Sequence, residues 1–192
     1  MNKARLEAFS DGVIAIIITI MVLELKIPHG SAMSDLIPLL PVFVSYVMSF
    51  VFVGIYWGNH HHLLHTAKHV NGKVIWSNMS LLFFLSLIPF TTGWMGENHF
   101  DNLPVAVYAV NLLGCAVTYF ILQEVIIADS TLSNRVVEAL EKQKKKGMIS
   151  LFMYIAAIPC AFFYPVISAI MFALVSIMWI IPDKNIEKAL KD

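Results

Sequence analysis

The sequence predicts an all-α integral membrane protein with six transmembrane helices, and three observations support this prediction. First, 58% of the 192 residues are hydrophobic and only 14% are charged, whereas soluble domains have about 45–50% apolar and about 25% charged residues. Second, the apolar residues form long runs, and a helix needs about 20 of them to cross the hydrocarbon core. Third, the basic residues divide very unequally between the two sides of a six-helix topology.

We interpret residues 1–192 as a single domain. The last apolar run, 147–182, is too long for one span, and we divide it at Tyr164 because the residue before Pro165 avoids the helical region. Pro159 is then expected to kink the preceding helix. The predicted spans are 8–26, 36–58, 74–95, 103–128, 147–164 and 166–182.

The basic residues give an independent test of topology. With six spans, both termini lie on the same side as the loops 59–73 and 129–146, and that side carries twelve of the thirteen Lys and Arg residues. Lys26 alone lies on the other side. Cytoplasmic loops are enriched in Lys and Arg, so we expect a multi-pass protein of the inner (plasma) membrane with both termini in the cytoplasm. The twelve are Lys3, Arg5, Lys68, Lys73, Arg135, Lys142, Lys144, Lys145, Lys146, Lys184, Lys188 and Lys191.

Charge and cysteine content exclude several function classes. The formal net charge is +0, so no nucleic acid is expected as a partner. Cys115 and Cys160 stand alone within apolar runs, without the spacing of a metal site or a disulfide framework. We expect no cofactor.

The first span carries the densest cluster of polar residues next to an apolar helix. Ser10 and Asp11 have two interpretations. They cap the helix at its positive end, or they lie inside a helix that begins earlier, in which case Asp11 needs a buried partner. That partner would be Arg5, a histidine or an indole from another span.

At about 100° per residue, several aliphatic residues of the first span share one face. Thr19 flanks one edge of this stripe, Glu24 the other, and Asp11 points to nearly the opposite side. Because almost every residue from 13 to 23 is apolar, periodicity does not by itself select this face. The stripe consists of Gly12, Ile16, Ile20, Leu23 and Ile27.

The same segment carries a family resemblance. The pattern Arg-x-x-x-Phe-Ser-Asp-Gly-x-x-Ala-Ile-x-x-Thr-x-x-x-Leu, from Arg5 to Leu23, resembles the hallmark of the transmembrane-protein-175 potassium channels. Supporting motifs are Tyr-Trp-Gly-Asn-His-His at 56–61, Trp-Ser-Asn at 76–78 and Leu-Ile-Pro-Phe at 87–90. The resemblance covers the whole chain as one six-span unit, which is the bacterial form.

The resemblance implies a homotetramer that passes potassium, and other monovalent cations to a lesser degree, through a central pore lined by the first helix. It maps an aliphatic constriction onto Ile16, Ile20 and Leu23, and a contribution to selectivity onto Thr19. It also implies a structural hub at the start of that helix. The hub residues are Arg5, Phe9, Ser10 and Asp11, and their candidate partners are Trp57, Asn59, His60, His61, Trp76 and Asn78.

An aliphatic ring would block ions by dewetting, and a small splay of the first helix would admit water. A carbonyl-type selectivity filter needs a glycine-rich re-entrant segment. The nearest string, Thr-Thr-Gly-Trp at 91–94, is short and is interpreted as an interfacial turn. We therefore expect no such filter.

The histidines after the second span offer a minority alternative. On a continuing helix His61, His65 and His69 share one face, and three imidazoles at that spacing can bind zinc or copper. Hydrogen bonding at the membrane edge and proton sensing are the other interpretations. An enzyme is not expected, because no catalytic carboxylate accompanies the histidines. A proton-coupled secondary transporter is the alternative to a passive channel, although no internal repeat is visible.

Overall fold

The computed structural model describes residues 2–128 and 132–180, and within these residues all regular structure is helical. The helices are α1 (Lys3–Leu23), α2 (Leu40–Thr66), α3 (Gly72–Ser86), α4 (Ile88–Glu97), α5 (Asn102–Ile127), α6 (Asn134–Phe163) and α7 (Pro165–Ile180), with two short 3-10 turns, η1 (Met33–Asp35) and η2 (Ile37–Leu39), before α2. The predicted all-α class is confirmed.

Length and composition mark the membrane-crossing segments. Five segments are long and apolar enough to cross a membrane, namely Lys3–Leu23, Met33–Thr66, Gly72–Glu97, Asn102–Ile127 and Asn134–Phe163, and Pro165–Ile180 is a shorter apolar helix. The chain therefore carries several membrane-spanning helices. The end of the last predicted span, 181–182, lies outside the described residues.

Several helix boundaries differ from the predicted spans; α1 begins at Lys3 instead of 8, and α2 continues to Thr66 instead of ending at 58. The third apolar run is two helices, because the ring of Pro89 clashes with the carbonyl of Leu85 and cannot continue the hydrogen-bond ladder. The string 91–94 lies inside α4, so its interpretation as an interfacial turn is wrong. The segment 134–146, expected in a loop, is the first part of α6.

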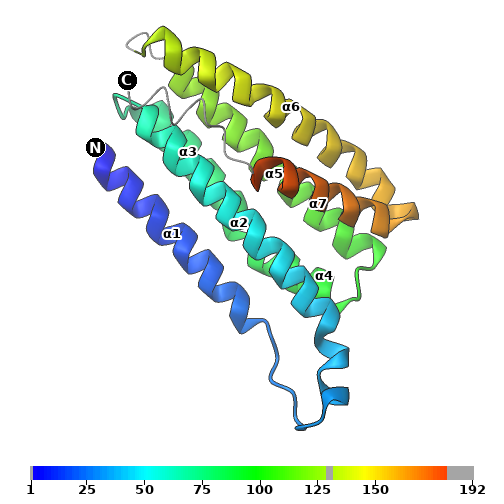
Figure 1. Ribbon diagram of the computed structural model, residues 1–192. Helices are drawn as coiled ribbons and strands as arrows, with labels where there is room; N and C mark the ends of the chain where they lie inside the picture. The colour runs from blue at the N-terminus through cyan, green and yellow to red at the C-terminus, as the bar shows by residue number, and fades with distance from the viewer. Residues whose placement is uncertain (1, 129–131, 181–192) are drawn as a thin grey trace.

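The helices form a bundle with α1 at one edge and α6 at the opposite edge (Figure 1). α5 is central and packs against α3, α4, α6 and α7, whereas α1 packs against α2, α3 and α4. Tyr164 separates α6 from α7, as the Tyr-Pro pair predicts. Among the residues that the structure describes, α1 contacts the bundle along one side.

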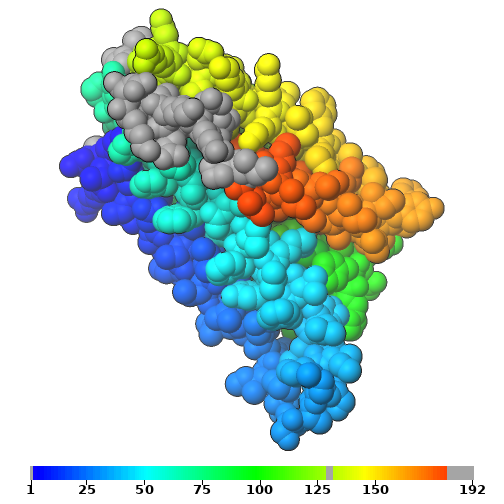
Figure 2. Space-filling view, viewed as in Figure 1, coloured from blue at the N-terminus to red at the C-terminus, as the bar shows by residue number. Residues whose placement is uncertain are grey.

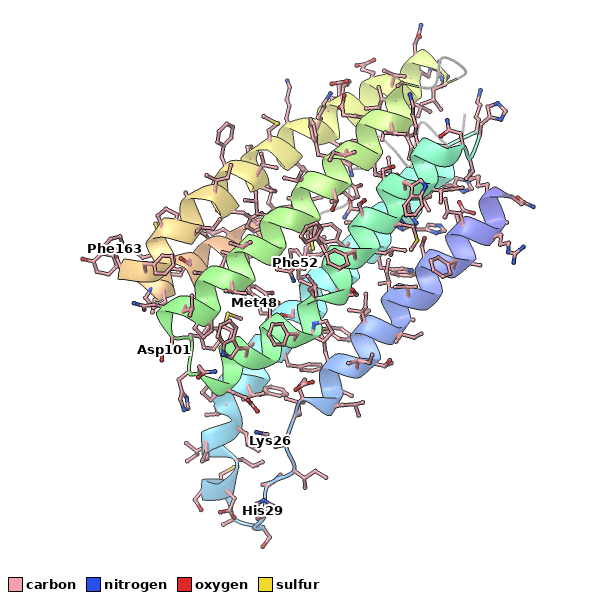
Figure 3. The ribbon with its side chains drawn as sticks, turned by 180° about the vertical axis from the view of Figure 1, so that it is seen from behind. Lys26, His29, Met48, Phe52, Asp101 and Phe163 are labelled. Atoms are coloured by element: carbon pink, nitrogen blue, oxygen red, sulfur yellow. The ribbon has the colours of Figure 1, made fainter. Side chains whose placement is uncertain are left out.

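The connection between α1 and α2 extends beyond the other helices, as the space-filling view shows (Figure 2). Lys26 and His29 on this connection lie at the same end of the bundle as Asp101 and Phe163 (Figure 3). At that end Lys26 Nζ lies 2.5 Å from Glu97 Oε1. The hydrogen bond that the Lys26 ammonium donates to the Glu97 carboxylate raises the pKa of Lys26 above its ordinary value.

Candidate functional site on the first helix

α1 begins well before the Ser10-Asp11 pair. Asn2 is the N-cap, and its side chain accepts a hydrogen bond from the backbone N–H of Ala4 at 3.2 Å. Asn is a favoured N-cap residue because its short side chain satisfies a free N–H of the first turn. Ser10 and Asp11 therefore lie inside the helix, and their interpretation as caps is wrong.

One face of α1 is buried against the bundle. The buried residues recur every three or four positions, which is the spacing of a single helix face. They are Leu6, Ser10, Ile14, Ile17 and Met21. Ser10 is the polar member of this otherwise apolar face.

Ser10 belongs to a buried chain of hydrogen bonds across three helices. Asn78 of α3 donates from Nδ2 to Ser10 Oγ at 3.0 Å, and Ser10 Oγ donates to the carbonyl of Leu6 at 2.9 Å. His60 of α2 lies with Nε2 2.6 Å from Asn78 Oδ1. All three side chains are fully buried. Buried polar groups are stable only when they are paired. These hydrogen bonds therefore favour one position of α1 against α2 and α3.

Asp11 has a separate partner. The indole Nε1 of Trp57 on α2 donates to Asp11 Oδ1 at 3.0 Å. An indole thus fills the role for which Arg5, a histidine or an indole was expected. Arg5 is exposed and lies on another side of α1, since residues six apart differ by about 120° around a helix.

Another side of α1 is left uncovered by the described residues of the single chain. The side chains of Ile16, Ile20 and Leu23 are 58%, 42% and 78% exposed. Ile27 lies beyond the end of α1 at Leu23, so the helical stripe stops one member earlier than the spacing predicts. The uncovered face adjoins an open groove of about 620 Å³ between α1 and α4, which Ile16, Ile20 and Glu24 help to line.

Thr19 lies on the same exposed side of α1. Its hydroxyl donates to the carbonyl oxygens of Ala15 and Ile16, at 3.1 and 2.9 Å. The hydroxyl proton is directed back to the helix, so the oxygen lone pairs are free to accept from solvent or to face a cation.

Other predicted partners lie elsewhere. Asn59 accepts a hydrogen bond from Gln143 of α6 at 3.1 Å, so it ties α2 to α6 instead of joining the hub. Trp76 is 74% exposed, and Phe9 is half exposed. The ring of His61 stacks on His65 with centroids 6.2 Å apart.

The candidate metal site is not assembled. α2 ends at Thr66, so His69 lies outside the helix that would have aligned it with His61 and His65. In residues 2–128 and 132–180, no three His, Cys, Asp or Glu side chains come together in an arrangement that could hold a metal ion.

Sequence reasoning missed two elements of this region. Glu7, one turn before Asp11, faces His65 and Lys3. Its position four residues before Asp11 on a helical pattern is the signal that could have found it. Gln143 and Gln123, joined at 3.2 Å, are buried amides whose partners depend on the unpredicted first half of α6.

Membrane-length helices, with a polar hub on the first of them, define an integral membrane protein. The sequence profile of the family described as endosomal/lysosomal potassium channel TMEM175 matches residues 5–89. A potassium channel of Chryseobacterium sp. (strain P1-3) is 52% identical over 192 residues, which is 100% of both chains. The chain therefore belongs to the TMEM175 family, as its motifs predict, and the family is one of ion channels and not of enzymes.

Two further relatives place the fold within this family. The crystal structure of a lysosomal potassium-selective channel TMEM175 homolog from Chamaesiphon minutus superposes with a TM-score of 0.84 at 25% identity, covering 94% of this chain and 97% of that one. The endosomal/lysosomal proton channel TMEM175 of Homo sapiens is 35% identical over 96 residues, which is 43% of this chain and 19% of the human protein.

Proposed function

We propose that the chain forms a passive, potassium-preferring cation channel whose pore is lined by α1. The observation that carries the proposal is the two-sided character of this helix. One face is buried and tied to α2 and α3 through Ser10 and Asp11, while Ile16, Ile20 and Leu23 face outward without cover. The names of the bacterial relatives, which are potassium channels, support the same function.

The proposed channel is a homotetramer. Four copies arranged around a common axis would bring the four uncovered α1 faces together, and rings of Ile16, Ile20 and Leu23 would form the constriction. Rings of aliphatic side chains gate by excluding water. Thr19, with its free oxygen lone pairs, is placed to offer each passing cation a ligand in exchange for water.

The proposed location is the plasma membrane, with both termini in the cytoplasm. The support is the excess of Lys and Arg on the side of the termini, twelve residues of thirteen. Permeant potassium would need no resident cofactor.

Two alternatives differ in the role of protons. A proton-coupled secondary transporter would move its substrate only when a proton gradient is imposed. Proton conduction through the same pore is favoured by the names of the vertebrate relatives, which are proton channels.

The test is ion flux into liposomes that contain the purified protein, with potassium and sodium gradients compared and a pH-sensitive dye inside. We expect downhill potassium flux to exceed sodium flux without any proton gradient. Flux that requires a proton gradient would contradict the channel and support the transporter. Acidification of the liposome lumen when no proton gradient has been imposed would establish proton conduction.

A further inference from the structure

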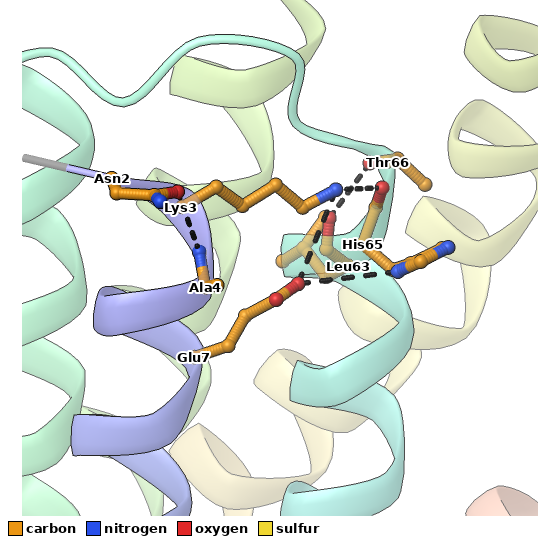
Figure 4. A network of polar contacts seen from close by, with 7 residues as sticks. All are labelled: Asn2, Lys3, Ala4, Glu7, Leu63, His65 and Thr66. Atoms are coloured by element: carbon orange, nitrogen blue, oxygen red, sulfur yellow. Dashed lines mark hydrogen bonds and ion pairs between the residues drawn. The ribbon is translucent and has the colours of Figure 1, made fainter.

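The N-terminal end of α1 meets the C-terminal end of α2 at a small polar cluster (Figure 4). Glu7 Oε1 is buried and lacks a hydrogen-bond partner. It lies 4.0 Å from Lys3 Nζ and 4.0 Å from His65 Nδ1. A buried carboxylate oxygen without a hydrogen bond is costly, so this oxygen is poised to accept one from either neighbour.

The contacts of the described residues around Glu7 and His65 come from α1 and α2. Lys3 Nζ donates to the backbone carbonyl of His65 at 2.5 Å, which already joins α1 to α2. On α2, the ring of His61 stacks on that of His65. Asp11 on α1 accepts a hydrogen bond from the indole of Trp57. Residues 72–97 of α3 and α4, which also pack on α1, supply no ion pair to Glu7.

We propose that Glu7 and His65 form a latch between α1 and α2 that closes when His65 binds a proton. An imidazole that gains a proton carries N–H groups on both ring nitrogens and a positive charge. Its Nδ1 can then donate to Glu7 Oε1, and closing the 4.0 Å gap to about 2.8 Å makes a charge-assisted hydrogen bond.

The consequence for conduction rests on the proposed function. If α1 lines the pore, the pore widens only when α1 moves relative to α2, and the latch opposes that movement at the N-terminal end. If a protonated His65 donates to Glu7, the hydrogen bond favours the arrangement in which the two side chains, now 4.0 Å apart, are in contact. Acid on the side of the N-terminus therefore lowers flux.

The first experiment measures potassium flux from liposomes with the pH varied between 8 and 5.5 on the side of the N-terminus. Wild-type flux is expected to fall by roughly two- to fivefold, the effect of a partly exposed ion pair. Glu7→Gln and His65→Gln should remove this dependence, because neither variant can form the charged pair. His69→Gln is the matched control, since His69 is exposed beyond α2, and should behave as wild type.

The second experiment does not depend on conduction. Thermal unfolding in detergent should show a larger destabilisation by Glu7→Gln at pH 5.5 than at pH 8, and the difference should vanish in a His65→Gln background. An unchanged difference in that background, or wild-type pH dependence of flux in His65→Gln, would overturn the latch. Absence of potassium flux in the wild type would instead overturn the proposed function, and the unfolding data would then decide the latch alone.

Discussion

Ser10 and Asp11 are adjacent in the sequence but bind different helices. Neighbouring residues of a helix point about 100° apart, so Ser10 reaches Asn78 on α3 while Asp11 reaches Trp57 on α2. Two short side chains thereby set both the position and the rotation of α1. This rotation turns the side chains of Ile16, Ile20 and Leu23 away from the bundle.

The Asp11–Trp57 contact can be tested by Trp57→Phe, which keeps an aromatic ring and removes the indole donor. We expect a loss of about 1 kcal/mol, because the bond involves a charged acceptor but is partly exposed. The measurement is the thermal unfolding midpoint in detergent. Trp76→Phe is the control, because Trp76 is 74% exposed, and equal losses in the two variants would contradict the assignment.

The buried chain can be tested by Asn78→Leu, which is similar in volume but leaves Ser10 and His60 without their shared partner. His60 Nε2 would then be unpaired, while Ser10 keeps its hydrogen bond to the carbonyl of Leu6. One unpaired buried group costs about 1–3 kcal/mol, so we expect a loss of this size and a lower yield of folded protein on size-exclusion chromatography. Asn98→Leu, which removes one exposed hydrogen bond, should change little. If Asn78→Leu folded with normal yield and stability, the buried hydrogen bonds of Ser10, Asn78 and His60 would not determine the position of α1.

At the residue scale, the sequence allowed the candidates to be predicted but not their pairing. Trp57, His60 and Asn78 were among the partners that the family resemblance implied, whereas the residues alone indicated only that Asp11 needs a buried partner. Asn59, His61 and Trp76 were expected beside them but lie elsewhere. Which residues pair depends on how each helix is rotated about its axis. The sequence of a helix that is apolar on every side does not indicate this rotation.

At the element scale, close packing joins α4 to α2. A methyl group added at Gly96 would lie 2.7 Å from the Cα of Val42 and 2.4 Å from Ser45 Oγ. Only glycine allows these two helices to approach so closely. On the same two helices, the hydroxyl of Thr92 of α4 donates a hydrogen bond to the hydroxyl oxygen of Ser49 of α2 at 2.7 Å.

Gly96→Ala is therefore expected to separate α2 and α4 and to lower stability by about 1–3 kcal/mol, the usual cost of overpacking. Thermal unfolding in detergent gives the change. Gly147→Ala is the matched control, because a methyl group there meets nothing within 4 Å, and it should be neutral or slightly stabilising. If both variants behaved alike, close approach at Gly96 would not limit the packing.

Hydropathy predicted the apolar core of each helix but not where each helix ends. The segment 134–146 is too polar to resemble a span, yet it is helical. An ion pair between Glu138 and Lys142, four residues apart with 2.7 Å between Oε1 and Nζ, supports the helix. The break before Pro89 has a sequence signal in the proline itself. The extension of α2 to Thr66 has none in hydropathy, because the histidines are polar.

At the scale of the whole molecule, α1 is an edge helix with an apolar face that the described residues of the chain do not cover. In the proposed channel of four copies, that face would line the pore. Shortening a side chain of the constriction should therefore widen the pore. Ile16→Ala and Leu23→Ala are expected to raise potassium leak from liposomes and to reduce the preference over sodium, and unchanged flux from correctly assembled protein would contradict the constriction.

The central claim is that the outward face of α1 lines the conduction path, and one measurement tests it most directly. In a chain whose Cys115 and Cys160 are replaced by Ala, a single cysteine is introduced at Ile20, and a positively charged thiol reagent is applied during potassium flux from liposomes. Leu174→Cys on α7, which is 52% exposed in the single chain, is the control. We predict that the reagent blocks flux in Ile20→Cys and leaves Leu174→Cys unaffected. Uninhibited flux in a labelled Ile20→Cys channel would contradict the claim.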